Sequence, residues 1–310
     1  MPRPDRYATV ISDLLPVIVN RHGGAASAAG EKLADRIEAA FAAVGREVEI
    51  RFLDGRAVAD AVAALSDWPL VVIGGGDGTI GCAAQARLGN KGTLAILPLG
   101  TRNHLARELG IPLDLEGAVS VAAGESSRRI DVATVNGAVF VNNASVGFYP
   151  LLVRWRDAES RRLPKWLATI SAGWAALRQL RHHRMHLQVG ESGRAVRTPI
   201  LFVGNNRYVL EPGRIGQRTA LDDGVLSVFA VSARSRIGFV WFAVRTFLGL
   251  GDPSRDFAAL GECDRLTVYS RSRAIDIALD GEVRRMAPPL QFELLPHALK
   301  VRTRHRMGSG

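Results

Sequence analysis

Short apolar runs alternate with amphipathic stretches in the first third of the chain. Runs of strand length, rich in aliphatic and β-branched residues, occupy positions 15–20, 47–53, 70–76 and 92–101. Apolar residues repeat every three or four positions between them, which predicts helices at 29–45, 57–66, 79–89 and 103–112, the last stopped by Gly110 and Pro112. This alternation is typical of a parallel sheet with helices on both faces. It predicts a doubly wound α/β domain over residues 1–128.

The pattern changes after residue 128. Asn136-Gly137 lies between two alternating apolar runs, which predicts a β-hairpin. Further alternating runs bounded by polar turns lie at 185–206, 224–232, 263–282 and 290–303. We therefore expect a second, mostly antiparallel β domain over 129–286, with helices inserted near 159–181 and 235–250.

The glycine-rich segment 74–79, GGGDGT, stands between a predicted buried strand and a predicted helix. Without Cβ atoms its backbone N–H groups can approach an anion closely, and the helix N-terminus adds partial positive charge. The segment therefore predicts a phosphate site. Asp77 complicates this, because a carboxylate repels phosphate. A bound divalent cation would resolve the repulsion, and the alternative is that Asp77 forms a turn or caps a helix.

The residues beyond this segment argue against two common kinds of phosphate-binding loop. Gly76, Gly78 and Gly81 fit G-x-G-x-x-G, but a dinucleotide-binding fold needs an acidic residue about 20 positions later. The stretch 95–103 contains none, and no G-K-[ST] occurs anywhere, which excludes a Walker loop. The net charge of +10 favours partners such as nucleotide phosphates or an anionic membrane. The dispersed charge and the lack of a recognised module argue against nucleic acid.

The length and the cysteine content of the chain limit the number of domains and the kinds of site that it can form. A chain of 310 residues is expected to form two domains. Cys82 and Cys263 have no C-x-x-C spacing, which excludes a disulfide framework and a thiolate metal cluster. No run of about 18 apolar residues occurs, so we expect no spanning helix.

Five segments, taken in their order along the chain, resemble the diacylglycerol kinase catalytic-domain family. They are GGGDGT at 74–79, LPLGTRNHLARELGIP at 97–112, NNASVGF at 142–148, DDGVLSV at 222–228 and LDGE at 279–282. The likeness is to the bacterial soluble lipid kinases and, more distantly, to sphingosine and ceramide kinases. It implies an α/β nucleotide-binding domain and a β-sandwich with ATP in the cleft between them. It also implies that segment 287–303 packs back onto the first domain.

The resemblance implies a set of functional residues. Those expected to bind ATP are Asn20, Gly75, Gly76, Asp77, Gly78, Thr79, Thr101 and Asn103. Glu282 matches the general base, with Asp280 beside it. In an extended segment residues two apart point the same way, so both carboxylates can face one cleft. The alternative for Glu282 is a solvated hairpin turn.

Magnesium is the expected cofactor, because hard cations choose oxygen ligands and accompany nucleotide phosphates. The resemblance also implies a structural Mg²⁺ at the DDG loop, with Asp223 as carboxylate ligand and carbonyl groups near Ala220 and Val225. Asp131 matches an aspartate of the family's metal–water network. A simple turn at 222–224 and a strand-start role for Asp131 are the alternatives.

Two departures from the family pattern leave other functions open. His104 stands where the family has aspartate, and Gly81-Cys82 replaces an Asn-Glu pair. A catalytically impaired nucleotide- or lipid-binding relative therefore stays open. An NAD-kinase-like enzyme is a further alternative because it shares GGDGT, although the late LDGE segment argues against it.

The predicted helix 159–181 gives an indication of which kind of molecule accepts the phosphoryl group. It carries Trp166 and Trp174, with basic residues at both ends, as in an interfacial helix. An apolar face that packs in the core is the alternative. The prediction is a cytoplasmic, ATP-dependent lipid kinase with a lipid substrate and peripheral contact at the inner membrane face. The identity of the lipid and the oligomeric state, including a homodimer, stay open.

Overall fold

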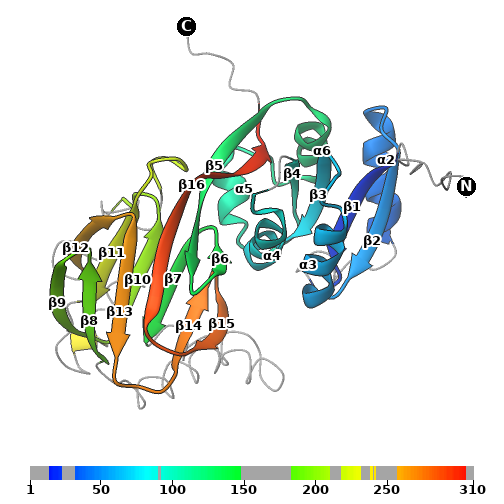
Figure 1. The fold of residues 1–310 in the computed structure, drawn as a ribbon. Coiled ribbons are helices and arrows are strands. Elements are labelled where there is room, and N and C mark those ends of the chain that lie inside the picture. The colour runs from blue at the N-terminus through cyan, green and yellow to red at the C-terminus, as the bar shows by residue number, and fades with distance from the viewer. Residues whose placement is uncertain are drawn as a thin grey trace, which may run out of the picture.

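The computed structural model of the protein describes residues 14–22, 32–89, 92–147, 183–209, 218–231, 238–239, 241 and 257–304. The predicted helix 159–181 and nearly all of 235–250 lie outside the described residues. A helix-bearing α/β domain and an all-β domain lie side by side (Figure 1). No helix in the described ranges has the length and apolar character needed to cross a membrane.

Four parallel strands form the sheet of the α/β domain. They pair in the order β2-β1-β3-β4, with bounds Leu15–Asn20 (β1), Val48–Leu53 (β2), Leu70–Gly75 (β3) and Thr93–Pro98 (β4). These strands match the predicted runs. The chain goes outward from β1 to β2 and returns to β3 on the other side of β1. Sheets of this kind bind ligands at the carboxyl ends of the strands where the order reverses, here between β1 and β3.

Helices cover both faces of this sheet. Their bounds are Lys32–Ala43 (α2), Gly55–Ala64 (α3), Asp77–Arg87 (α4), His104–Glu108 (α5) and Leu115–Ala123 (α6). Helices α2 and α6 contact each other on one face, and α3 and α4 contact each other on the other. The predicted stop after α5 is confirmed, with Gly110 in a left-handed conformation at φ +69°. Helix α6 was not predicted.

The all-β domain is a sandwich. One layer is a six-stranded antiparallel sheet in the order β12-β11-β10-β7-β14-β15, with bounds Asn143–Gly147 (β7), Ile200–Asn205 (β10), Leu226–Val231 (β11), Phe257–Cys263 (β12), Ile275–Leu279 (β14) and Glu282–Met286 (β15). The other layer contains Ser127–Val135 (β5), Ala138–Phe140 (β6), His183–Val189 (β8), Ser192–Thr198 (β9) and Arg265–Ser270 (β13). Apolar residues from both layers form one buried cluster. The predicted hairpin at Asn136-Gly137 is confirmed by the pairing of β5 with β6.

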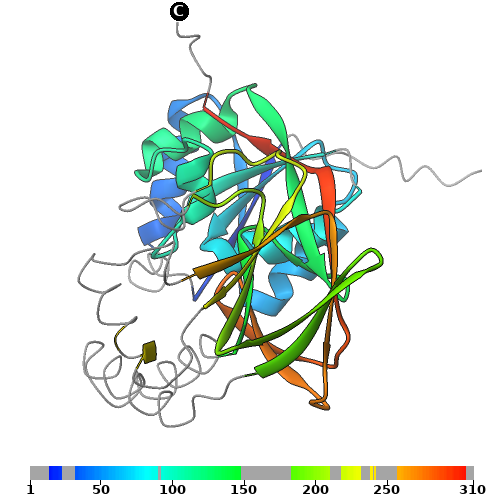
Figure 2. The same ribbon diagram turned by 90° about the vertical axis from the view of Figure 1, so that its left-hand side faces the viewer.

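Strand β16 (Leu290–Arg302) joins the two domains into one ten-stranded sheet. Its first residues pair antiparallel with β13, and Lys300 and Val301 pair in parallel with β4. The pairing with β5 shifts register between Leu295 and Leu299, around His297 at φ +49°. Figures 1 and 2 show β16 and β5 running together from the sandwich to the α/β domain. The end of segment 287–303, which the resemblance places against the first domain, thus lies beside β4.

Candidate active site

Two glycine loops at the carboxyl ends of β3 and β4 lie in direct contact. A Cβ built on Gly100 would lie 2.3 Å from the Cα of Gly76, nearer than any side chain allows. The backbone N–H of Leu99 donates to the carbonyl of Gly75 at 3.1 Å. Glycine at position 100 is therefore required for the loops to form one surface.

Gly100→Ala is expected to separate these loops. The added methyl group meets backbone rather than a flexible side chain, so the free energy of unfolding should fall by about 1–3 kcal/mol. Urea unfolding and binding of a non-hydrolysable ATP analogue measure the two effects. Gly55→Ala is the matched control, because its Cβ would meet only Asn20 Nδ2, at 3.9 Å. An unchanged unfolding free energy and unchanged analogue affinity in Gly100→Ala would show that the contact is unimportant.

Asn20 and Thr79 meet at the point where the strand order reverses. The Asn20 Nδ2 group donates to the Thr79 hydroxyl at 2.8 Å. The Thr79 side chain also covers Gly75, where a Cβ would lie 2.6 Å from it. Three of the residues predicted to bind ATP therefore lie together, from β1, β3 and α4.

Asp77 and Asn103 shape the loops through their side chains. The carboxylate of Asp77 accepts the backbone N–H groups of His104 and Leu105, each at 3.1 Å, and so caps α5 from α4. Asn103, at φ +51°, accepts the N–H of Gly100 at 3.0 Å and donates to two carbonyl groups of its own loop. The helix-capping alternative for Asp77 is thus realised, on the neighbouring helix. Thr101, between these residues, is exposed.

The turn between β14 and β15 brings two carboxylates to the start of α4. A Cβ on Gly78 would lie 2.4 Å from Glu282 Oε1, and one on Gly81 would lie 3.2 Å from Asp280 Oδ2. Asp280 (φ +48°) and Gly281 (φ +90°) both adopt left-handed conformations, as in a two-residue hairpin turn. The expectation of an extended segment at 280–282 is wrong. Asp280 and Gly281 form the turn of the hairpin, Glu282 begins β15, and the hairpin faces the glycine loop.

Asp280 anchors this hairpin to the preceding strands. Its carboxylate accepts the backbone N–H groups of Val141 and Asn142 at 2.8 Å and of Asn143 at 3.1 Å. Desolvation raises the pKa of Asp280 to about 6, although the three N–H donors oppose this shift. The Glu282 side chain is 53% exposed, and the Arg284 guanidinium lies 3.8 Å from Glu282 Oε2. Glu282 therefore remains accessible while Asp280 is held in place.

The raised pKa of Asp280 predicts a specific pH dependence of stability. Its ordinary value is 3.8, so the native state holds the proton more tightly than the unfolded chain does. The corresponding stability is fully present below pH 3.8 and is lost as the pH rises through about 6. The unfolding free energy of the wild type should fall relative to that of Asp280→Asn by up to about 3 kcal/mol from pH 4 to 7. Parallel urea titrations measure this difference, and a pH-independent difference contradicts the assignment.

Arg218 links the sandwich to α5 beside these loops. Its buried guanidinium pairs with Glu108 and donates to the Asn142 side-chain oxygen at 2.9 Å. It also donates to the carbonyl groups of Val141, at 2.7 Å, and Asn205, at 3.2 Å. Sequence reasoning missed Arg218, because no local pattern marks a partner 110 positions away. Two of its partners lie in segments of the family resemblance, Glu108 within 97–112 and Asn142 within 142–148.

Tyr208 completes this link. Its hydroxyl donates to the carbonyl of Asn142 at 2.9 Å, and burial raises the pKa of Tyr208 to about 12. The phenol is therefore a neutral donor at physiological pH. It fixes the backbone that also supplies N–H groups to Asp280.

Asp131 connects the DDG loop to the bend in β16. One carboxylate oxygen accepts the N–H of Gly224 at 2.9 Å, and the other accepts the N–H of His297 at 2.8 Å. Each oxygen can accept a further hydrogen bond, so the contribution of Asp131 to a metal–water network stays a prediction.

The remaining predicted metal ligands lie in a hydrogen-bonded loop. The carbonyl of Val225 accepts the N–H of Asn206 at 2.8 Å, and Asp223 lies 3.4 Å from the Thr219 hydroxyl. No cluster of three or more His, Cys, Asp or Glu suited to a metal occurs among the described residues. The predicted set is of a different kind, with one carboxylate and backbone carbonyl groups near Ala220 and Val225, so the structural Mg²⁺ at the DDG loop stays a prediction.

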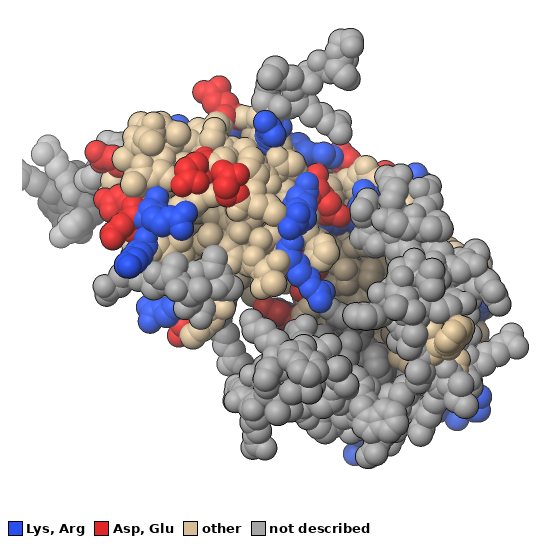
Figure 3. Space-filling model, turned by 180° about the vertical axis from the view of Figure 1, so that it is seen from behind, with Lys and Arg blue, Asp and Glu red and all other residues tan. Residues whose placement is uncertain are grey.

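Seen from behind, the surface is hollowed near its centre (Figure 3). Acidic side chains lie inside the hollow, and basic side chains lie beside it.

Comparison with known proteins supports the resemblance seen in the motifs. Residues 15–135, which contain both glycine loops, match the diacylglycerol kinase catalytic domain. The chain is a kinase, as predicted from its motifs.

Relatives of this kinase match most of its length. It is 29% identical over 278 residues to "Probable lipid kinase YegS-like" of Pseudomonas aeruginosa strain PAO1, over 86% of this chain and 89% of the relative. It is 27% identical over 238 residues to "Diacylglycerol kinase" of Bacillus subtilis strain 168, over 76% and 78% of the two chains. A crystal structure of a candidate diacylglycerol kinase from Bacillus anthracis str. Sterne superposes with a TM-score of 0.73 at 21% identity. The superposition covers 97% of this chain and 98% of the other. The predicted two-domain fold class is thereby confirmed.

Proposed function

We propose that this kinase transfers the γ-phosphoryl group of ATP to a lipid hydroxyl between the glycine loops and the 279–282 hairpin. The carrying observation is the contact of the Glu282 carboxylate with Gly78. These residues are about 200 positions apart and come from different domains. Their contact gives one place both a phosphate-binding backbone and an accessible base.

The backbone at the start of α4 supplies the phosphate site. Phosphoryl transfer requires positioning and neutralisation of charge, which N–H groups at a helix N-terminus provide. Asn20 and Thr79 hold this backbone from one side, and Gly100 supports it from the other. Mg²⁺ accompanies ATP and neutralises phosphate charge, and the carboxylate of Asp77, in the first turn of α4, is an oxygen donor that fits such an ion.

Glu282 is proposed as the general base. Its carboxylate accepts the proton of the lipid hydroxyl as the oxygen attacks the γ-phosphorus, and the bond from that phosphorus to the bridging oxygen breaks to release ADP. Asp280, fixed by three backbone N–H groups, positions the hairpin that carries Glu282. The exposed side chain of Glu282 is accessible to a hydroxyl acceptor.

The lipid class of the acceptor is supported by the relatives, which are named as lipid kinases and a diacylglycerol kinase. The decisive experiment incubates the enzyme with labelled ATP and mixed micelles of diacylglycerol, a glycerophospholipid, a sphingoid base or ceramide, with NAD in a separate reaction. We expect label in one lipid class. Label in NAD alone, or in no acceptor, would overturn the proposal.

A further inference from the structure

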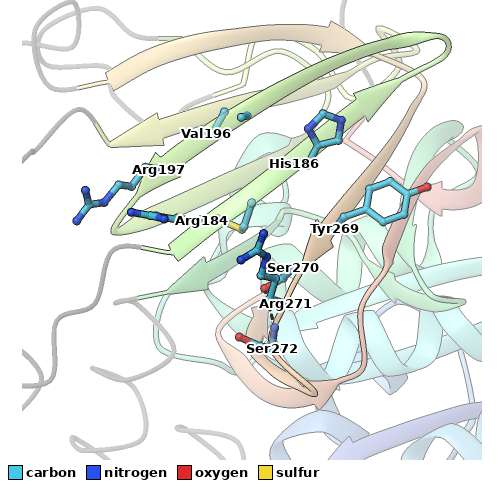
Figure 4. Close-up of a pocket in the computed structure, with 10 residues that line it drawn as sticks. Arg184, His186, Val196, Arg197, Tyr269, Ser270, Arg271 and Ser272 are labelled. Atoms are coloured by element: carbon cyan, nitrogen blue, oxygen red, sulfur yellow. Dashed lines mark hydrogen bonds between the residues drawn. The ribbon is translucent and has the colours of Figure 1, made fainter.

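Three arginines stand side by side on the outer face of the sandwich, far from the glycine loops. Arg184 on β8 is paired directly with Arg197 on β9. Strand β13 pairs Ser270 with Met185, and the next step of this register places Arg271 beside Arg184. The three side chains border one open depression of about 850 Å³ (Figure 4). We refer to Arg184, Arg197 and Arg271 as the arginine row.

The arginine row destabilises the sheet when no anion is bound to it. Like charges directly opposite on neighbouring strands destabilise a sheet. None of the three side chains forms an ion pair with a described residue, and all three are exposed. Arg265 on β13 differs, since it pairs with Glu293 at 2.8 Å. A bound anion would supply the missing negative charge.

We propose that the arginine row binds phosphate groups of anionic phospholipids and docks the enzyme on a membrane surface. Guanidinium groups match phosphate geometry with paired N–H donors. Neighbouring strands are about 4.8 Å apart, so three arginines spread over about 10 Å, which suits several headgroups better than one small anion. The hydroxyl groups of Ser270 and Ser272 border the same depression and can donate to the same phosphates.

One further observation favours a membrane as the partner. His186 and Tyr269 form the next row, with ring centroids 6.4 Å apart, and Tyr269 is 44% exposed. An exposed tyrosine beside basic residues suits the boundary between headgroups and acyl chains. The choice of a membrane rests on the proposed lipid substrate, whereas the row is separate from the residues proposed for phosphoryl transfer.

Vesicle flotation of the full chain tests this proposal without ATP. Vesicles contain phosphatidylcholine alone or with 30 mol% phosphatidylglycerol at ~0.1 M salt, where surface attraction acts over a Debye length. The wild type should bind only the anionic vesicles. Arg184→Gln/Arg197→Gln/Arg271→Gln should lower the partition coefficient roughly a hundredfold, because each basic residue near an anionic surface contributes about a factor of five to six.

A matched variant distinguishes the effect of the arginine row from the effect of the net charge of the protein. Arg36→Gln/Arg46→Gln/Arg265→Gln removes the same three charges from exposed positions elsewhere and should retain most of the binding. Arg184→Lys/Arg197→Lys/Arg271→Lys keeps the charge and should restore most of it. No wild-type binding, or equal losses in the two glutamine variants, would overturn the proposal.

Two readouts separate membrane docking from a small-anion site and from a role in catalysis. Inorganic phosphate at millimolar concentration should not displace the wild type from vesicles, and full displacement would instead indicate a site for a small anion. Phosphorylation of a lipid dispersed in neutral detergent should be unchanged in the glutamine variant, because the row lies outside the proposed active site. The variant should unfold at the same or a higher temperature than the wild type, since like-charge repulsion is removed.

Discussion

Glu282→Gln is expected to lower kcat by a factor of about 10²–10⁴, the usual contribution of a general base. The amide has the shape of the carboxylate but cannot accept the hydroxyl proton. The Glu282 side chain is 53% exposed, and its ion pair with Arg284 is long, at 3.8 Å. The unfolding free energy should therefore change by less than about 0.5 kcal/mol. Binding of ATP should be nearly unchanged, since the proposed phosphate contacts come from the backbone.

Steady-state transfer of labelled phosphate to the preferred lipid measures this effect. Glu47→Gln is the matched control, because it makes the same exchange at an exposed position in the α/β domain. The control should retain wild-type kcat. If Glu282→Gln retained it as well, Glu282 would not be the base.

Arg218→Ala is expected to lower the free energy of unfolding by about 3–5 kcal/mol, as for a broken buried ion pair. The substitution leaves Glu108 without its cation and removes the Arg218 donor from the side chain of Asn142 and from the carbonyl of Asn205. The carbonyl of Val141 also loses a donor but still accepts from Asn205 Nδ2 at 2.9 Å. Each buried acceptor without a donor adds to the loss. The effect should exceed that of any exposed arginine because the guanidinium is almost entirely enclosed.

Urea unfolding followed by tryptophan fluorescence measures this loss. Arg207→Ala is the control, since Arg207 makes a comparable but exposed ion pair with Glu262 at 3.0 Å. Exposed pairs contribute about 0–1 kcal/mol. Equal losses in the two variants would show that Arg218 does not stabilise the junction between the domains.

The parallel strands could be predicted because each is a separate apolar run. Val71, Val72 and Ile73 of β3 are fully buried, and their sequence shows it directly. Helix α6 was missed, although Asp114 at its N-cap and Gly124 at its end were available as signals. Its alanines, glycine and serine give weak periodicity. The pairing of β16 with both β4 and β13 depends on contacts across the whole chain, which local patterns do not encode.

The candidate site could be predicted only where a local sequence pattern marks it. The glycine segment carries its own signal, because a loop of glycines before a helix suits phosphate. The role of Asp77 as a cap for α5, by contrast, depends on the packing of two loops 27 residues apart. The turn conformation of Asp280 and the Arg218 link likewise arise from tertiary structure. Motif resemblance identified the residues of the hairpin, and only the fold shows how they meet Gly78.

The most direct test of the central claim is a crystal structure of Glu282→Gln with a non-hydrolysable ATP analogue and Mg²⁺. The account predicts the β- and γ-phosphates on the backbone N–H groups of residues 76–79. It also predicts that the side-chain amide introduced at position 282 lies within reach of a hydroxyl placed in line with the γ-phosphorus. A nucleotide bound elsewhere, or phosphates turned away from the 279–282 hairpin, would contradict it.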